Sequence, residues 1–281
     1  MQFTQPGFGF FNRKPYKIGV ALSGGGARGF AHAGALQALE DMGIKPNLLA
    51  GVSAGSVVCV LYSAGKTPME IVKAFSEAKF SDFARLGVPK DGFFKLDGFK
   101  KFLIEQLGEY KNIENLPIPT VIGATNIDTC SAELFEDGEI TERVLASCAI
   151  PLIFKPQRIN GNHYVDGGVL HNLPAWAIRS RCKYLIGINC SPVIPSRYKA
   201  SLVNIAYRSY NMMSRQNTKS DLELCDLAIE ILNIADYKVF NLREIKKVYR
   251  AGYEATMEAL IANGFKSPST IKKKKRFRFP F

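Results

Sequence analysis

The stretch KIGVALSGGGARGFAHAGALQALEDMG, residues 17–43, decides the fold. Residues 17–24 form a short apolar and partly β-branched run, which is typical of a strand buried on both faces. The run breaks into three glycines, and apolar residues then recur at near-helical spacing up to Gly43. The stretch therefore predicts a strand, a glycine-rich turn and a helix, the opening unit of a parallel sheet covered by helices.

The same order repeats at once, with a strand at 47–51 running into an apolar helix at 53–65. Further helices are expected at 67–78, 96–108, 141–150, about 201–224 and 241–264, and strands at 119–128, 131–137, 182–190 and 226–232. We expect Thr67, Asp97 and Thr141 to begin three of these helices. A hairpin is expected to turn at 160–162. The pattern predicts a three-layer α/β/α sandwich with a mostly parallel central sheet.

Length and composition indicate one large domain. The chain has 281 residues, of which 47% are hydrophobic and 22% charged. We expect an N-terminal extension at 1–14, a single domain at 15–265 and a basic, aromatic, flexible tail at 266–281. No apolar run approaches the roughly 20 residues of a membrane span, and the N-terminus lacks the pattern of a secretion signal. These features predict a cytoplasmic protein.

The six cysteines are scattered without a C-x-x-C pair, so we expect buried free thiols and no metal site. The net charge of +12 is concentrated at the end of the chain. Seven basic residues occur there, namely Lys266, Lys272, Lys273, Lys274, Lys275, Arg276 and Arg278. Such a block suits an anionic surface, and Phe277, Phe279 and Phe281 could enter lipid headgroups. We expect peripheral contact with an anionic membrane and no nucleic-acid partner; a solvated tail is the alternative.

The segment GVSAG, residues 51–55, matches G-x-S-x-G between an expected strand and an expected helix. A sharp strand-to-helix turn holds the serine in a strained conformation that requires small neighbours, here Gly51 and Gly55. The helix N-terminus would then favour negative charge developing beside the serine. Ser53 is therefore the candidate nucleophile of a serine esterase.

The segment GGGARG, residues 24–29, also lies between a strand and a helix. Consecutive glycines can point several N–H groups at one place, as an oxyanion hole requires. The candidate donors are Gly24, Gly25 and Gly26, together with Ala54 of the serine turn. The segment also satisfies the dinucleotide pattern G-x-G-x-x-G, but the second strand ends in AGVS without the acidic residue that holds a ribose.

The segment DGG, residues 166–168, follows the strand expected from the hairpin. A carboxylate followed by two glycines can approach another backbone closely, although an isolated DGG more often marks an ordinary turn. Asp166 is the carboxylate candidate, and Gly167 and Gly168 support it.

Together, GGGARG at 24–29, GVSAG at 51–55 and DGG at 166–168 resemble the patatin-like phospholipase family, in which three such motifs occur in this order. The resemblance extends over roughly residues 15–265. It implies a patatin-like fold and a Ser–Asp dyad in which Ser53 is the nucleophile and Asp166 the proton acceptor. Arg28 and Gly29 belong to the glycine-rich motif, where Arg28 would brace the loop or bind a phosphate headgroup.

A Ser–Asp–His triad is the alternative to the dyad. His171 is the candidate because the order Ser53, Asp166, His171 is that of α/β-hydrolases, yet four residues leave little room for a relay. His32 is expected to pack within its helix, and His163 to point away from Asp166. We expect hydrolysis of acyl esters of (lyso)phospholipids or related acylglycerols through an acyl-serine, without a cofactor. An acyltransferase that uses the same acyl-serine is the nearest rival.

Overall fold

The computed structural model describes residues 15–78, 80–83, 85–86, 94–192, 195, 200–239 and 241–266. The expected N-terminal extension lies outside the described residues, as does the expected tail apart from Lys266. None of the helices in the described part of the chain has the length and hydrophobicity that crossing a membrane requires.

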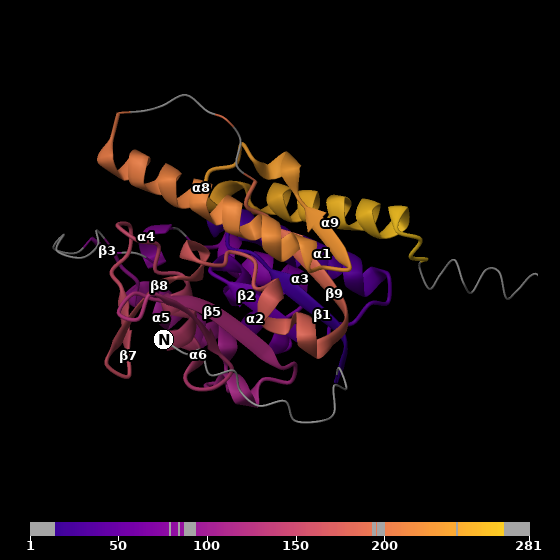
Figure 1. The fold of residues 1–281 in the computed structure, drawn as a ribbon, viewed down its shortest axis with the longest axis horizontal. Coiled ribbons are helices and arrows are strands. Elements are labelled where there is room, and N and C mark those ends of the chain that lie inside the picture. Colours follow the sequence, from indigo (N-terminus) through magenta and orange to yellow (C-terminus); the bar gives the residue numbers. More distant parts are fainter. Residues whose placement is uncertain are drawn as a thin grey trace, which may run out of the picture.

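Eight of the described strands form a central sheet in the order β10, β9, β1, β2, β5, β8, β7, with β6 also paired to β5 (Figure 1). Their bounds are β1 Tyr16–Leu22, β2 Leu48–Val52, β5 Thr120–Asn126, β6 Ser131–Phe135, β7 Gln157–Ile159, β8 Asn162–Asp166, β9 Cys182–Asn189 and β10 Leu227–Glu230. The five strands from β10 to β5 pair in parallel, and β6, β7 and β8 pair antiparallel. The predicted mostly parallel sheet is confirmed. A separate two-stranded sheet, β3 (Arg85–Leu86) with β4 (Phe94–Lys95), was not predicted.

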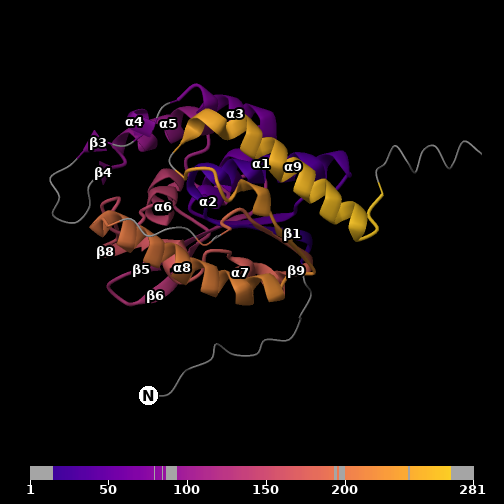
Figure 2. The same cartoon turned by 90° about the horizontal axis from the view of Figure 1, so that it is seen from above.

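Helices cover both faces of the sheet (Figure 2). One face carries α1 Phe30–Asp41, α2 Ala54–Ser63, α3 Pro68–Ser76, α4 Phe80–Phe83, α5 Asp97–Leu107, α6 Ile140–Ser147 and α9 Ile245–Ala262. The other face carries α7 Ala175–Ile178 and α8 Leu202–Glu223. Each face has its own cluster of buried apolar side chains, so the three layers predicted from the sequence are present.

Two of the predicted helix starts are wrong. Thr67 does cap α3, because its hydroxyl accepts from Glu70 N and the Glu70 carboxylate accepts from Thr67 N. Asp97, however, lies in the first turn of α5. Thr141 lies inside α6, where its hydroxyl donates to Glu139 instead of capping.

The predicted hairpin is confirmed, whereas the expected burial of the cysteines holds for three of the six. The hairpin between β7 and β8 turns at Asn160 and Gly161, which both have positive φ as a type I′ turn requires. All six cysteines are free thiols; Cys59, Cys182 and Cys190 are buried as expected, Cys148 and Cys225 are only partly buried, and Cys130 is exposed in the turn between β5 and β6.

Candidate active site

Ser53 lies at the turn between β2 and α2, with φ 51° and ψ −124°. A positive φ is unfavourable for a residue with a side chain, so the turn must be held by its surroundings. The flanking glycines permit it: a Cβ at Gly51 would lie 2.5 Å from the Gly55 carbonyl carbon, and one at Gly55 would overlap Leu22 O. The predicted serine elbow is therefore present, and Ser53 is buried at its tip.

Strand β5 brings Ser53 and Asp166 together. Val52, the last residue of β2, is in register with Gly123, and Asp166, the last residue of β8, is in register with the next residue, Ala124. Strand β6 pairs with both of these β5 residues from the opposite edge. Strands β2 and β8 therefore meet end to end along one edge of β5, although 109 residues lie between them in the sequence.

Asp166 is a fully buried carboxylate. Its Oδ1 accepts from Gly168 N at 2.8 Å and from the Tyr210 hydroxyl at 2.9 Å, whereas Oδ2 has no hydrogen-bond partner among the described residues. Burial raises the pKa of Asp166 to about 6, opposed by the nearby Ser53 side chain and by the hydrogen bonds from Gly168 and Tyr210. A carboxyl with this pKa can accept a proton near neutral pH and release it again.

The glycine-rich segment packs against the serine elbow. A Cβ at Gly24 would lie 3.1 Å from Ser53 Cβ, and one at Gly29 would overlap Ala54 Cβ. Gly26 has φ +57° and passes so close to Val239 O that a side chain would not fit. The 3₁₀ turn Gly26–Gly29 then leads into α1.

The predicted oxyanion donors are not equivalent. The Gly24 N–H donates to Asn172 O at 3.0 Å, so Gly24 is corrected from a donor to a packing residue. The N–H groups of Gly25, Gly26 and Ala54 have no acceptor among the described residues. Three candidate donors therefore remain beside Ser53.

Arg28 braces the glycine-rich segment. Its guanidinium donates to three main-chain carbonyls: Nε to Tyr237 O at 2.8 Å, Nη1 to Pro192 O at 3.0 Å and Nη2 to Ala235 O at 2.8 Å. Of the two roles predicted for Arg28, this geometry favours bracing, because all three guanidinium nitrogens already donate to main-chain carbonyls.

None of the three histidines is hydrogen-bonded to Ser53 or Asp166 in the described structure. His32 is buried with Nε2 2.8 Å from Ser23 O and 3.1 Å from Cys190 Sγ, and burial lowers its pKa to about 4. His163 pairs with Asp128 at the surface. His171, the triad candidate, pairs through Nδ1 with Asp221 Oδ2 at 3.1 Å.

Two contacts that hold the site could not be predicted from sequence spacing. Ser147, in the last turn of α6, accepts from Ser53 N at 2.7 Å and donates to Gly123 O at 2.6 Å. Tyr210 reaches Asp166 from α8, 44 residues along the chain. The sequence shows Tyr210 only as a polar residue on an expected helix. Nothing in the sequence indicates that its hydroxyl contacts Asp166 on another element.

An apolar pocket opens beside Ser53. Its walls come from the glycine-rich turn, α2, α3, α4, α5 and the segment after α6. Representative lining residues are Phe30, Val57, Phe75, Phe99, Ile150 and Phe154. Among the described residues, no group of three His, Cys, Asp or Glu side chains lies close enough to share a metal ion. The site thus combines a serine, a carboxyl and apolar walls.

The sequence is similar to one protein family and to several curated proteins. The family described as patatin-like phospholipase matches residues 20–178, more than half of the chain. A probable lipid hydrolase of Invertebrate iridescent virus 6 is 32% identical over 189 residues, covering 58% of this chain and 64% of that protein. A lysophospholipase of Saccharomyces cerevisiae is 31% identical over 180 residues, covering 61% of this chain and 11% of that protein. The chain thus spans less than two thirds of the length of these relatives.

Among solved structures, VipD from Legionella pneumophila aligns with a TM-score of 0.49 and 16% identity, covering 88% of this chain and 67% of that chain. The family assignment rests on the sequence match, which includes the glycine-rich segment, the serine elbow and the DGG segment. By that match, this chain belongs to the patatin-like phospholipase family.

Proposed function

We propose that this protein is a serine lipid acyl hydrolase that cleaves carboxylic esters of (lyso)phospholipids or related acylglycerols with a Ser53–Asp166 dyad. The observation that carries the proposal is the end-to-end meeting of β2 and β8, which sets a buried carboxyl of raised pKa next to a serine elbow. The apolar pocket beside Ser53 suits an acyl chain.

The first half of the proposed reaction acylates the serine. Ser53 Oγ attacks the ester carbonyl carbon while its proton moves to Asp166 Oδ2, the oxygen without a partner among the described residues. The N–H groups of Gly25, Gly26 and Ala54 stabilise the oxyanion, each worth about 3 kcal/mol if it is well aligned. The tetrahedral intermediate then collapses: the ester C–O bond breaks, and the leaving alcohol takes the proton from Asp166.

The second half releases the fatty acid. Water gives a proton to Asp166 and attacks the acyl carbon, and Ser53 then leaves with that proton, which restores the starting state. Histidine takes no part, in keeping with the pairing of His171 to Asp221. An alcohol in place of water would give acyl transfer, the rival outcome expected from the sequence.

The test uses a short-chain aryl ester and a fluorophosphonate that labels activated serines. We expect Ser53→Ala and Asp166→Asn each to lower kcat/KM at least a thousandfold, in the range seen when the members of such dyads and triads are removed. The matched control, His171→Ala, should retain most of the activity. Loss of activity in a folded His171→Ala variant would instead support the triad, and unchanged activity in Ser53→Ala would exclude the proposal.

The substrate class needs a separate measurement. We expect the wild-type protein, incubated with a total lipid extract, to release fatty acids and lysolipids, and Ser53→Ala to release neither. Adding a primary alcohol separates hydrolysis from transfer, because a transferase would form a new ester in place of free fatty acid.

A further inference from the structure

The two oxygens of Asp166 have different surroundings. Oδ1 accepts two hydrogen bonds, from Gly168 N and from the Tyr210 hydroxyl, and Oδ2 accepts none among the described residues. A carboxylate held at one oxygen by two donors cannot rotate freely about its Cβ–Cγ bond. The pair of donors therefore fixes which oxygen remains for a proton from Ser53.

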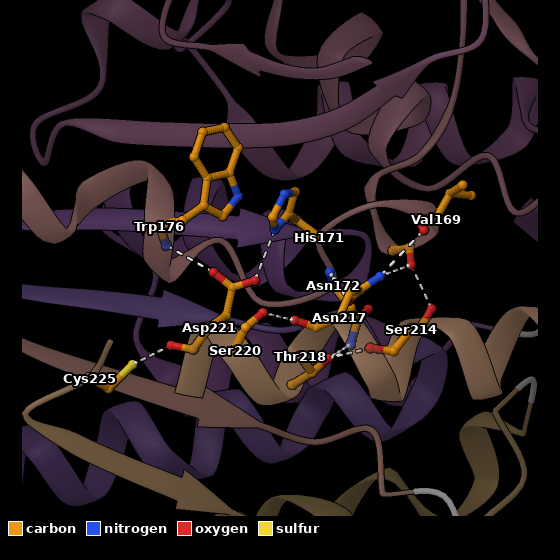
Figure 3. Close-up of polar contacts among 11 residues, drawn as sticks. Val169, His171, Asn172, Trp176, Ser214, Asn217, Thr218, Ser220, Asp221 and Cys225 are labelled. Atoms are coloured by element: carbon orange, nitrogen blue, oxygen red, sulfur yellow. Dashed lines mark hydrogen bonds and ion pairs between the residues drawn. The ribbon is translucent and has the colours of Figure 1, made fainter. Parts of the chain in front are cut away.

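Tyr210 lies on α8, and this helix is hydrogen-bonded to the DGG segment. Ser214 Oγ donates to Gly168 O at 2.7 Å, Asn217 Nδ2 donates to the same oxygen at 3.1 Å, and Asp221 Oδ1 accepts from Trp176 N at 3.0 Å (Figure 3). With Tyr210, these residues follow one another at intervals of four, three and four, which places them on one face of α8. The contacts fix the part of α8 from Tyr210 to Asp221 against the DGG segment and α7.

Tyr210 can act only as a donor towards Asp166 at working pH. Burial and the neighbouring carboxylate raise the pKa of Tyr210 well above its usual value, so its hydroxyl keeps its proton. Two other titratable groups interact with Asp166: the Cys148 thiol, directly after α6, and the Tyr207 phenol of α8. Their pKa values are raised as well, mainly by burial, so both stay neutral near pH 6.

Gly168 leaves the space that Tyr210 occupies. A Cβ at Gly168 would overlap the Tyr210 hydroxyl and would lie 3.1 Å from Asp166 Oδ1. The second glycine of the DGG segment is thus needed in this chain for the approach of the phenol. The Tyr210–Asp166 hydrogen bond and the glycine at position 168 are two separate observations that support this contact.

We propose that Tyr210 is a positioning residue, which holds Oδ1 of Asp166 together with Gly168 N so that Oδ2 serves as the base. This inference rests on the proposed dyad. Tyr210 has no hydrogen bond to Ser53 among the described residues; we infer that it acts through the orientation and the charge of the carboxylate. No feature of the 166–168 motif itself points to a phenol on α8.

The test is the pH dependence of kcat/KM for the aryl ester in Tyr210→Phe, which keeps the ring and removes the hydroxyl. Losing a hydrogen bond to the charged form of Asp166 raises its pKa, so the acidic midpoint should move up by about one pH unit. We also expect kcat on the alkaline plateau to fall severalfold, because the carboxylate is held less firmly. Tyr207→Phe, a phenol lost one turn away on the same helix, should keep the wild-type midpoint.

A second variant protects the test against misfolding. Gly168→Ala should displace the Tyr210 hydroxyl and reproduce the upward shift, and circular dichroism and thermal melting would verify the fold of each variant. A folded Tyr210→Phe or Gly168→Ala enzyme with the wild-type midpoint would overturn the inference. Failure of the proposed function is seen separately, since the wild-type protein would then not react with the fluorophosphonate at Ser53.

Discussion

Asp166 sets the acidic limit of the proposed activity. The base works only when ionised, and burial raises the pKa of its carboxyl to about 6. We therefore expect kcat/KM of the wild-type enzyme to fall tenfold per pH unit below about pH 6 and to level off above it. His32, whose pKa is lowered to about 4, is neutral throughout this fall. A midpoint near 4, the ordinary range of an aspartate, would contradict the assignment.

The same burial makes Asp166 unfavourable for stability. The pKa of Asp166 in the folded state lies above the unfolded value of 3.8. The neutral carboxyl therefore costs no stability below about pH 4, and ionisation of the buried group lowers the free energy of unfolding as pH rises through about 6. The two-unit difference corresponds to about 3 kcal/mol at most. Asp166→Asn, which has no charge to bury, should therefore melt several degrees above wild type at pH 8, with a difference that vanishes towards pH 4.

An exposed carboxylate supplies the control for this stability prediction. Asp128 is held in its charged form by His163, which lowers its pKa, so the sign is opposite. Asp128→Asn should not raise the melting temperature at pH 8. If Asp166→Asn melted at the wild-type temperature at both pH values, the carboxyl would not be destabilising the fold.

The sequence indicated the individual residues of the candidate site but not all of their hydrogen-bond partners. Ser53 and Asp166 are recognisable because each lies in a glycine pattern that a tight turn requires. Gly24 was misassigned because spacing cannot show that Asn172 O already accepts its N–H. Tyr210 was missed because its contact joins two elements 44 residues apart, and no local pattern records such a pairing.

Among the elements, α3 and its neighbours shape the apolar pocket beside Ser53. Phe75 of α3 is buried in the pocket wall, with ring centroids 4.7 Å from Phe30 and 4.6 Å from Phe102. Shortening this side chain lengthens the space beyond Ser53. We expect Phe75→Leu and Phe75→Ala to shift the preferred aryl ester towards longer acyl chains, measured as kcat/KM over a series of chain lengths.

The truncation of Phe75 also weakens the fold, so it needs a matched control. A buried Phe→Ala change costs about 3–5 kcal/mol, and Phe75→Leu should cost less. Phe135→Ala, on β6 and outside the pocket lining, removes a similarly buried ring. It should lower the melting temperature without changing the chain-length preference. An equal shift in both variants would show that loosening of the fold, and not pocket depth, changes the preference.

Elements with strong periodicity were predicted well from the sequence. The strand–turn–helix units at β1–α1 and β2–α2 were recognisable because a buried strand, a glycine turn and an apolar helix follow without interruption. The starts of α5 and α6 were misplaced by one and two residues: Asp is favourable in a first turn as well as at a cap, and the Thr141 hydroxyl donates to Glu139 instead of capping. The pairing of β8 with β5 could not be predicted from local sequence patterns either, because strand register is set by packing between distant segments.

For the whole molecule, the remaining question is how a protein with its nucleophile beside an apolar pocket meets a lipid surface. Seven of the basic residues lie between Lys266 and Arg278, with no acidic residue in between, and they supply more than half of the net charge of +12. Near an anionic membrane each is worth about 1 kcal/mol at moderate salt. We expect the full-length protein to bind vesicles of phosphatidylglycerol and phosphatidylcholine more tightly than pure phosphatidylcholine vesicles, in a salt-sensitive way.

Two variants separate the charges from the phenylalanines in the same segment. Removing residues 266–281 should abolish the preference for anionic vesicles, whereas turnover of a soluble aryl ester should stay at the wild-type level because the site residues all lie upstream. Replacing the seven basic residues with Gln, with the three phenylalanines kept, should lose the salt-sensitive part of binding alone, since screening acts on charge. Equal binding of all three proteins in co-sedimentation would exclude the segment as the membrane contact and leave the folded domain to make it.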